Sequence, residues 1–201
     1  MEKHPDVEYV MLSERQITKR VKQLAKQLDT LYEGRKPVVV CILKGSVVFF
    51  SELIRNMRTP LTLDFMSVSS YGKGTKSTGE IQIKKDLATD IAGRDVLIVE
   101  DIIDSGNTLY NLKKLLNGRS PSSVNIVTLL DKPERREVPM EPEYKGFVIK
   151  DEFVIGYGLD YAEEYRNLPY VGVLKRSVYE KLKQKPLLWE EVFYCNKKTP
   201  R

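Results

Sequence analysis

The chain has few of the residues on which several common classes of protein depend. Among its 201 residues there are one histidine, His4, and two cysteines, Cys41 and Cys195. A single histidine nearly excludes both a histidine zinc site and a histidine general base. The two cysteines lie far apart, so no disulfide framework is expected, which favours a reducing compartment. Cys41 lies in an apolar run, and we expect a buried, unreactive thiol there.

Long apolar segments are also missing. No run of about 18 apolar residues occurs, and the polar N-terminus has no apolar signal core. We therefore expect a soluble cytoplasmic protein that does not associate with membranes. The net charge of +5 suits an anionic substrate, but lysine and arginine form no dense stripe interleaved with aromatic residues. Nucleic-acid binding is therefore not expected.

Predicted strands and helices alternate along most of the chain. Four apolar or alternating runs predict strands of one sheet: residues 38–43, 61–68, 96–99 and 124–130. Helical spacing predicts three helices, over residues 17–31, 47–57 and 109–116. A capping-box pattern, Ser13 to Gln16, precedes the first of these helices. Short strands are predicted at residues 81–84, 153–157 and 170–173, and an irregular segment at residues 132–145.

This order favours an α/β protein with a mainly parallel sheet flanked by helices. The length fits one domain spanning residues 1–201, with a core over about residues 7–175. Residues 176–201 form a C-terminal extension without a functional signal. Residues 69–80 are rich in glycine, lysine and threonine, and we expect a mobile loop there.

One segment combines acidic residues with a polar loop. The apolar strand that ends at Val99 is followed by Glu100 and Asp101, and then by Asp104-Ser-Gly-Asn-Thr108 before a helix. Paired carboxylates after a buried strand are suited to holding a polyol or a metal ion. Backbone N–H groups at a helix N-terminus form a ready anion site. The segment therefore suits a phosphorylated ribose, whereas simple helix capping would not account for the acidic pair.

This ordered segment resembles the phosphoribosyl pyrophosphate (PRPP) signature of the type I phosphoribosyltransferases, in the form found in purine-salvage members. The resemblance extends over roughly residues 7–175. It implies the family's fold, with a small hood over a base pocket and a flexible lid. It also implies transfer of the phosphoribosyl group from PRPP to N9 of a 6-oxopurine such as hypoxanthine or guanine, with Mg²⁺ as cofactor. Relatives of this kind are homodimers or homotetramers.

The resemblance also assigns roles to residues of this chain. It implies PRPP binding by Lys44, Gly45, Ser70, Tyr71, Glu100, Asp101, Asp104, Ser105, Gly106, Asn107, Thr108 and Arg166. It implies a base pocket formed by Lys132, Phe153, Val154 and Asp160. The metal ligands implied are Glu100, Asp101 and Asp160, and the general base implied is Asp104, near N7 of the purine.

Lys132 bears on the choice of base. It matches the lysine that donates to the purine O6 atom, and the amino group of adenine would oppose a donor with donors. A buried charged donor left unpaired costs a few kcal/mol, which is enough for strong rejection of adenine.

Several alternatives remain open on the sequence. Lys44 could lie in an ordinary turn, Arg166 on the surface, and Phe153 in the core. The acceptor could be xanthine or a pyrimidine. A protein of a different class, a regulatory nucleotide- or RNA-binding protein on the same fold, could keep the phosphate loop without catalysis.

Overall fold

The computed structural model describes residues 2–70 and 81–183. Its main sheet contains β2 (Val38–Ile42), β3 (Thr62–Ser70), β4 (Ile81–Lys85), β5 (Asp95–Ile103), β6 (Ser123–Asp131) and β7 (Tyr144–Val148). The strand order is β4-β3-β2-β5-β6-β7. All neighbours pair in parallel except β4, which runs antiparallel to β3. The predicted mainly parallel α/β sheet is therefore confirmed.

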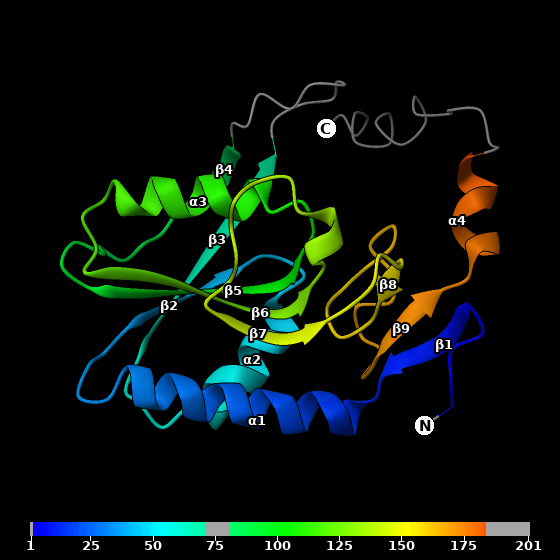
Figure 1. The fold of residues 1–201 in the computed structure, drawn as a ribbon, viewed down its shortest axis with the longest axis horizontal. Helices are drawn as coiled ribbons and strands as arrows, with labels where there is room; N and C mark the ends of the chain where they lie inside the picture. The colour runs from blue at the N-terminus through cyan, green and yellow to red at the C-terminus, as the bar shows by residue number, and fades with distance from the viewer. Residues whose placement is uncertain (1, 71–80, 184–201) are drawn as a thin grey trace, which may run out of the picture.

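Helices cover both faces of this sheet (Figure 1). α1 (Glu14–Leu31) and α2 (Val47–Asn56) lie on one face, and α3 (Asn107–Asn117) lies on the other. Side chains of β2 alternate between the two resulting cores. Val39 and Cys41 pack with α1 and α2, whereas Val38, Val40 and Ile42 pack with α3. The continuously apolar sequence of β2 thus reflects burial on both faces.

Local signals predicted two further features of this region. The capping box of α1 is present, because Ser13 N donates to Gln16 Oε1 over 2.9 Å and Gln16 N donates to Ser13 Oγ over 3.4 Å. Cys41 is fully buried, and burial raises the pKa of its thiol to about 11. A neutral, shielded thiol is a poor nucleophile, as the sequence predicts.

A second sheet lies at one end of the molecule. It is antiparallel and contains β1 (Val7–Leu12), β8 (Val154–Ile155) and β9 (Val171–Leu174), in the order β1-β9-β8. α4 (Arg176–Lys183) follows β9 at the same end (Figure 1). The sequence predicts β8 and β9, but β1 was not expected, since its partner β9 lies far along the chain.

The irregular segment predicted over residues 132–145 is partly wrong. It contains a single 3₁₀ turn, η1 (Pro133–Arg135), and the first residues of β7. β7 is an edge strand, and Arg20 of α1 donates to the carbonyl oxygens of Lys145 and Gly146 over 2.6 and 2.9 Å. A distant side chain therefore helps to hold a strand that has weak local signals.

Most of the predicted lid, residues 69–80, lies outside the residues that the structure describes. Ser69 and Ser70 end β3, and Tyr71 lies outside the described residues. None of the helices in the two described ranges is long and apolar enough to cross a membrane.

Candidate active site

The predicted site residues follow three neighbouring parallel strands. Lys44 comes two residues after β2, Asp104 directly after β5 and Lys132 directly after β6. These strands are adjacent in the sheet, so their carboxyl ends share one edge. Ligands of open α/β sheets bind at that edge. The sheet topology thus brings together residues that are up to 88 positions apart in sequence.

The loop of residues 104–108 joins β5 to α3. Gly106 is the N-cap of α3 and has a left-handed φ of 82°, which favours glycine. Gly106 has no side chain to cap the helix, and only Asn107 N, at the first helical position, donates to a nearby hydroxyl, Ser105 Oγ, over 3.4 Å. The next N–H groups of the first turn remain available to an anion. A cavity of about 260 Å³ opens there, lined by Glu100, Ser105, Thr108 and neighbouring residues. The side chain of Asn107 instead donates to Glu137 over 2.6 Å, and Asn107 does not line this cavity.

Arg136 and Glu137, which sequence analysis missed, hold this loop from outside. Arg136 Nη1 donates to the carbonyl oxygen of Asp104 over 2.7 Å, and Glu137 N donates to that of Ser105 over 2.9 Å. Arg136 is itself paired with the buried carboxylate of Asp131. These residues lie in the segment predicted to be irregular, where no sequence signal marks them.

Glu100 and Asp101 lie within β5 rather than after it. Burial raises the pKa of Glu100 well above its ordinary value, with a further contribution from the charge of Asp101. Burial also raises the pKa of Asp101 to about 6, against the opposing hydrogen bond from Ile102 N. Glu100 Oε2 is buried and has no hydrogen-bond partner among the described residues. Two carboxylates held in this way favour the approach of a cation.

The 44–46 turn packs against the acidic pair and against a later loop. The Leu43–Lys44 peptide is cis. A Cβ on Gly45 would lie 1.7 Å from Asp101 Oδ2, and a Cβ on Gly158 would lie 2.0 Å from the carbonyl oxygen of Gly45. Both positions therefore require glycine, because the chain segments approach too closely for a side chain.

Arg166 reaches the same place from the later loop. Its Nη1 donates to the carbonyl oxygen of Gly158 over 2.8 Å, and its Nη2 lies 2.8 Å from Asp160 Oδ1. Glu163, another residue that sequence analysis missed, contacts both Arg166 and Lys44. Lys44 and Arg166, the two cations predicted to bind pyrophosphate, thus form ion pairs with the same carboxylate.

A second cavity, of about 550 Å³, lies on the other side of Asp104. The predicted base-pocket residues Lys132, Phe153, Val154 and Asp160 all line it. Lys132 is buried and donates to the carbonyl oxygen of Glu152 over 2.8 Å. Its Nζ also lies 3.5 Å from Asp104 Oδ1 and 3.6 Å from Asp151 Oδ1.

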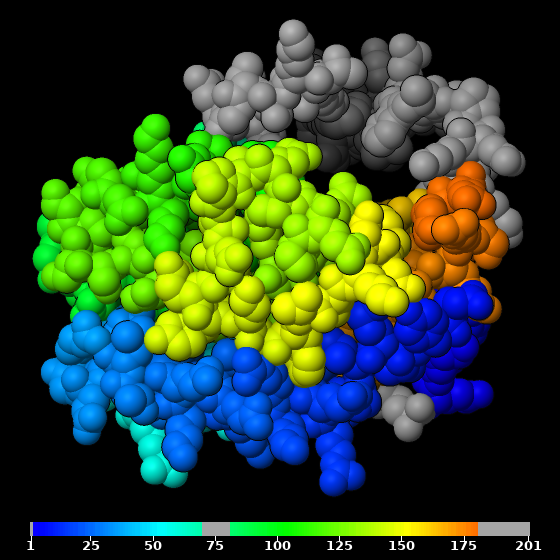
Figure 2. All heavy atoms as spheres, viewed as in Figure 1, coloured from blue at the N-terminus to red at the C-terminus, as the bar shows by residue number. Residues whose placement is uncertain are grey.

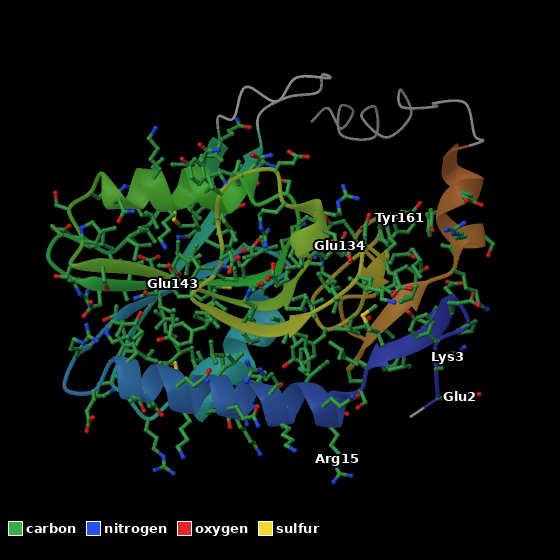
Figure 3. The ribbon with its side chains drawn as sticks, in the orientation of Figure 1. Glu2, Lys3, Arg15, Glu134, Glu143 and Tyr161 are labelled. Carbon is green, nitrogen blue, oxygen red and sulfur yellow. The ribbon has the colours of Figure 1, made fainter. Side chains whose placement is uncertain are left out.

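Phe153 is 42% exposed, so it is not a core residue. Its ring stacks on Tyr179 of α4, with ring centroids 5.4 Å apart, and meets Tyr161 edge-on. Figure 2 shows α4 (orange) directly beside the yellow segment around residue 150. Tyr161 lies between η1, which carries Glu134, and α4 in the view of Figure 3. Sequence analysis missed Tyr179, because the short helix α4 has no recognisable motif.

The two cavities share Ile102 and Asp104. The predicted site residues that the structure describes therefore gather in one region, except that the side chain of Ser70 is not described and Asn107 points away. Within the described residues no group of three or more acidic, histidine or cysteine side chains could hold a metal ion. A larger surface hollow, of about 1010 Å³, lies elsewhere and contains none of the predicted residues.

Comparisons with known proteins agree with this geometry. The model of the phosphoribosyl transferase domain family matches residues 11–162. The chain therefore belongs to the phosphoribosyl transferase family. It is 52% identical over 180 residues to the hypoxanthine-guanine phosphoribosyltransferase of Bacillus subtilis, covering 90% of this chain and 99% of that protein.

Two further similarities extend this finding. A crystal structure of a hypoxanthine phosphoribosyltransferase from Staphylococcus aureus has a TM-score of 0.85 and 53% identity, covering 88% of this chain and 96% of that one. The bifunctional protein TilS/HprT of Listeria monocytogenes is 53% identical over 176 residues, 88% of this chain. The chain spans 27% of the length of that bifunctional protein.

Proposed function

We propose that this chain transfers the phosphoribosyl group of PRPP to N9 of a 6-oxopurine, hypoxanthine or guanine, with release of pyrophosphate. The observation that carries the proposal is the sharing of Ile102 and Asp104 by two cavities. One cavity is built on a helix N-terminus, and the other contains Lys132 and Phe153. A ligand that fills both joins an anionic group to a planar base with an acceptor atom, as a purine nucleotide does.

Each cavity has a separate task in this reaction. The N–H groups at the start of α3 bind the 5′-phosphate. Phe153 stacks on the base, and Lys132 donates to O6. Lys132 is already surrounded by acceptors on three sides, so its ammonium is fixed in direction before a base arrives. A base with a 6-amino group offers this ammonium no acceptor at position 6, and adenine is rejected.

Asp104 lies where the two cavities meet. Its side chain is 49% exposed and lines both cavities, so it can contact the base and the ribose together. During transfer, N9 of the base attacks the anomeric carbon while the bond to pyrophosphate breaks. Asp104 accepts or shares the proton at N7 and so offsets the positive charge that develops on the purine. Lys44 and Arg166 stabilise the negative charge that develops on pyrophosphate.

Mg²⁺ fits the acidic residues of the site. Glu100 and Asp101, with Asp160 nearby, would hold it. Burial of Glu100 Oε2 without a hydrogen-bond partner is unfavourable, and a cation bound there would offset this cost. Mg²⁺ commonly binds through one or two carboxylates together with substrate oxygens and waters. A protein cluster of three ligands is therefore not needed. Bound Mg²⁺ supplies charge neutralisation at the leaving pyrophosphate.

The same proposal includes the protein's partners and location. We infer that PRPP and 6-oxopurine bases are its substrates, and that it acts in the cytoplasm as a homodimer or homotetramer. Nucleic acid and membranes are not expected partners.

Pyrophosphate release tests the proposed reaction. Hypoxanthine, guanine, xanthine, adenine and uracil are compared in parallel with PRPP and Mg²⁺. Turnover is expected with hypoxanthine and guanine and not with adenine. Turnover with uracil alone would move the acceptor to the pyrimidines. Nucleotide binding without turnover on any base would favour the regulatory alternative.

A further inference from the structure

One carboxylate bridges the two cations of the proposed pyrophosphate subsite. Glu163 Oε2 lies 2.9 Å from Lys44 Nζ and 3.4 Å from Arg166 Nη2. The hydrogen bond from Lys44 lowers the pKa of Glu163, so the carboxylate is charged at neutral pH. Lys44 and Arg166 come from loops that are far apart in sequence, and Glu163 is the only described side chain that forms an ion pair with both.

A carboxylate oxygen between an ammonium and a guanidinium occupies the position that a phosphate oxygen would take there. Both anions use the same donors in the same geometry. We infer that Glu163 is an internal, displaceable occupant of the pyrophosphate subsite, which leaves when PRPP or pyrophosphate binds. This inference rests on the proposed function, because it takes Lys44 and Arg166 as pyrophosphate ligands.

The surroundings of Glu163 allow it to leave. Its side chain is 65% exposed, and exposed ion pairs contribute little because water competes for both partners. Its backbone is fixed, since Glu163 N donates to Asp160 Oδ2 over 3.0 Å. Ala162 and Glu163 both have left-handed φ values, which turn the chain so that this side chain faces Lys44. Rotation of the side chain into solvent therefore frees both cations without movement of the loop.

Asp160 differs from Glu163 in this respect. Its side chain is less exposed, and it contacts Arg166 Nη2 over the shorter distance of 2.8 Å. Asp160 therefore keeps Arg166 in place when Glu163 leaves. Arg166 Nε is buried without a partner in the described part of the chain, so the guanidinium retains unused donor capacity. The bridge thus holds Lys44 extended in the free protein and weakens the binding of the product pyrophosphate by competition.

Substitution of Glu163 by glutamine tests whether the Glu163 carboxylate competes with pyrophosphate for Lys44 and Arg166 or instead helps to bind pyrophosphate. Glu163→Gln keeps the shape of the side chain and removes the charge that competes with pyrophosphate. We expect the dissociation constant for magnesium pyrophosphate, measured by titration calorimetry on the full chain, to fall about three- to ten-fold. Pyrophosphate should become a correspondingly stronger product inhibitor.

Glu164→Gln is the matched control. It makes the same change in net charge one residue away, and the Glu164 side chain makes no hydrogen bond or ion pair within residues 2–70 and 81–183. It should leave pyrophosphate affinity unchanged. In a Lys44→Met background the effect of Glu163→Gln should shrink, because one of the two contested cations is gone.

The results separate this inference from the proposed function. Wild-type turnover together with unchanged or weaker pyrophosphate binding by Glu163→Gln would overturn the inference alone. Equal tightening in Glu164→Gln would also overturn it, since the effect would then be one of general charge. Tighter pyrophosphate binding by Glu163→Gln in a protein that turns over no base would support the inference and remove the proposed reaction.

Discussion

Arg136 Nη1 donates a hydrogen bond to the backbone carbonyl oxygen of Asp104 over 2.7 Å. Asp104 is the proposed general base, and its side chain is half exposed, so its position depends on the backbone that carries it. Arg136 in turn is held by Asp131, which is 1% exposed and also lies 3.0 Å from Lys145 Nζ. An ion cluster centred on the buried Asp131 carboxylate thus fixes the backbone of the catalytic loop.

Arg136→Lys tests this positioning role. Lysine keeps the charge but lacks the planar fork that lets Arg136 reach Asp131 and the Asp104 carbonyl together. We expect kcat/KM for PRPP to fall about 10- to 100-fold, because small displacements of catalytic groups have effects of this size. Arg119→Lys is the control, since Arg119 pairs with Asp86 far from the site and should leave kcat/KM unchanged. Wild-type kcat/KM in Arg136→Lys would show that the loop is positioned without Arg136.

The main sheet and its site could be predicted because their signals are local. Continuous apolar runs marked β2, β5 and β6, and polar residues directly after each run marked the edge where they meet. β1 and β7 lacked such signals. β1 is stabilised by pairing with β9, and β7 by Arg20, which contacts its carbonyl oxygens from α1. Contacts between distant segments leave no periodic pattern in either segment.

Missed site residues have the same explanation. Arg136, Glu163 and Tyr179 act through partners on other elements: a backbone carbonyl, a lysine turn and an aromatic ring. An arginine, a glutamate or a tyrosine in a polar stretch is common on any protein surface. Only the fold shows that these three contact residues of the site.

Asp104→Asn is expected to separate binding from chemistry. The amide keeps the shape and lines both cavities, but it cannot accept a proton from the purine. We expect kcat to fall by about two to four orders of magnitude, whereas the affinity for GMP should change little. Rapid-quench turnover and equilibrium GMP binding measure the two effects. Unchanged turnover would remove Asp104 from the role of general base.

Lys132→Ala is expected to act mainly on the base. Loss of the ammonium removes the donor to O6, and the KM for hypoxanthine should rise about 10- to 100-fold. The KM for PRPP should change much less, because Lys132 lines only the base cavity. Lys150→Ala removes an exposed lysine nearby and serves as the control. Equal losses for base and PRPP in Lys132→Ala would place Lys132 outside the base pocket.

Gly158→Ala tests the close contact between the two loops. The new Cβ would lie 2.0 Å from the carbonyl oxygen of Gly45, so one loop must move. We expect the free energy of unfolding in urea to fall by about 2–4 kcal/mol, with weaker PRPP binding. Gly34→Ala is the control, because Gly34 also has a left-handed φ but no atom within 4 Å of the new Cβ. It should cost only about 1 kcal/mol of conformational strain. Equal losses in both variants would mean that strain alone, rather than the loop contact, decides the effect.

The half-buried Asp101 carboxyl makes the stability of the ligand-free protein depend on pH. Burial raises its pKa from 3.8 to about 6, so between these values the folded state binds more protons than the unfolded state. Its contribution therefore favours the folded state below about pH 4 and is lost as the pH rises to about 6. Asp101→Asn removes this titration. We expect the difference in free energy of unfolding between Asp101→Asn and wild type to shift in favour of the variant by about 1–3 kcal/mol from pH 4 to pH 7.

The same carboxylate should behave differently when ligand is present. Mg²⁺ with PRPP favours the charged form, so wild type should gain more stability from these ligands at pH 7 than Asp101→Asn does. Denaturation in urea gives the free energy of unfolding of each protein under four conditions: at pH 4 and pH 7, each with and without Mg²⁺ and PRPP. A pH-independent difference between the two proteins would mean that Asp101 titrates normally in the fold. The charged Asp101 would then destabilise the free protein, and bound ligand would restore the lost stability. This behaviour is expected of residues that are retained for binding rather than for stability.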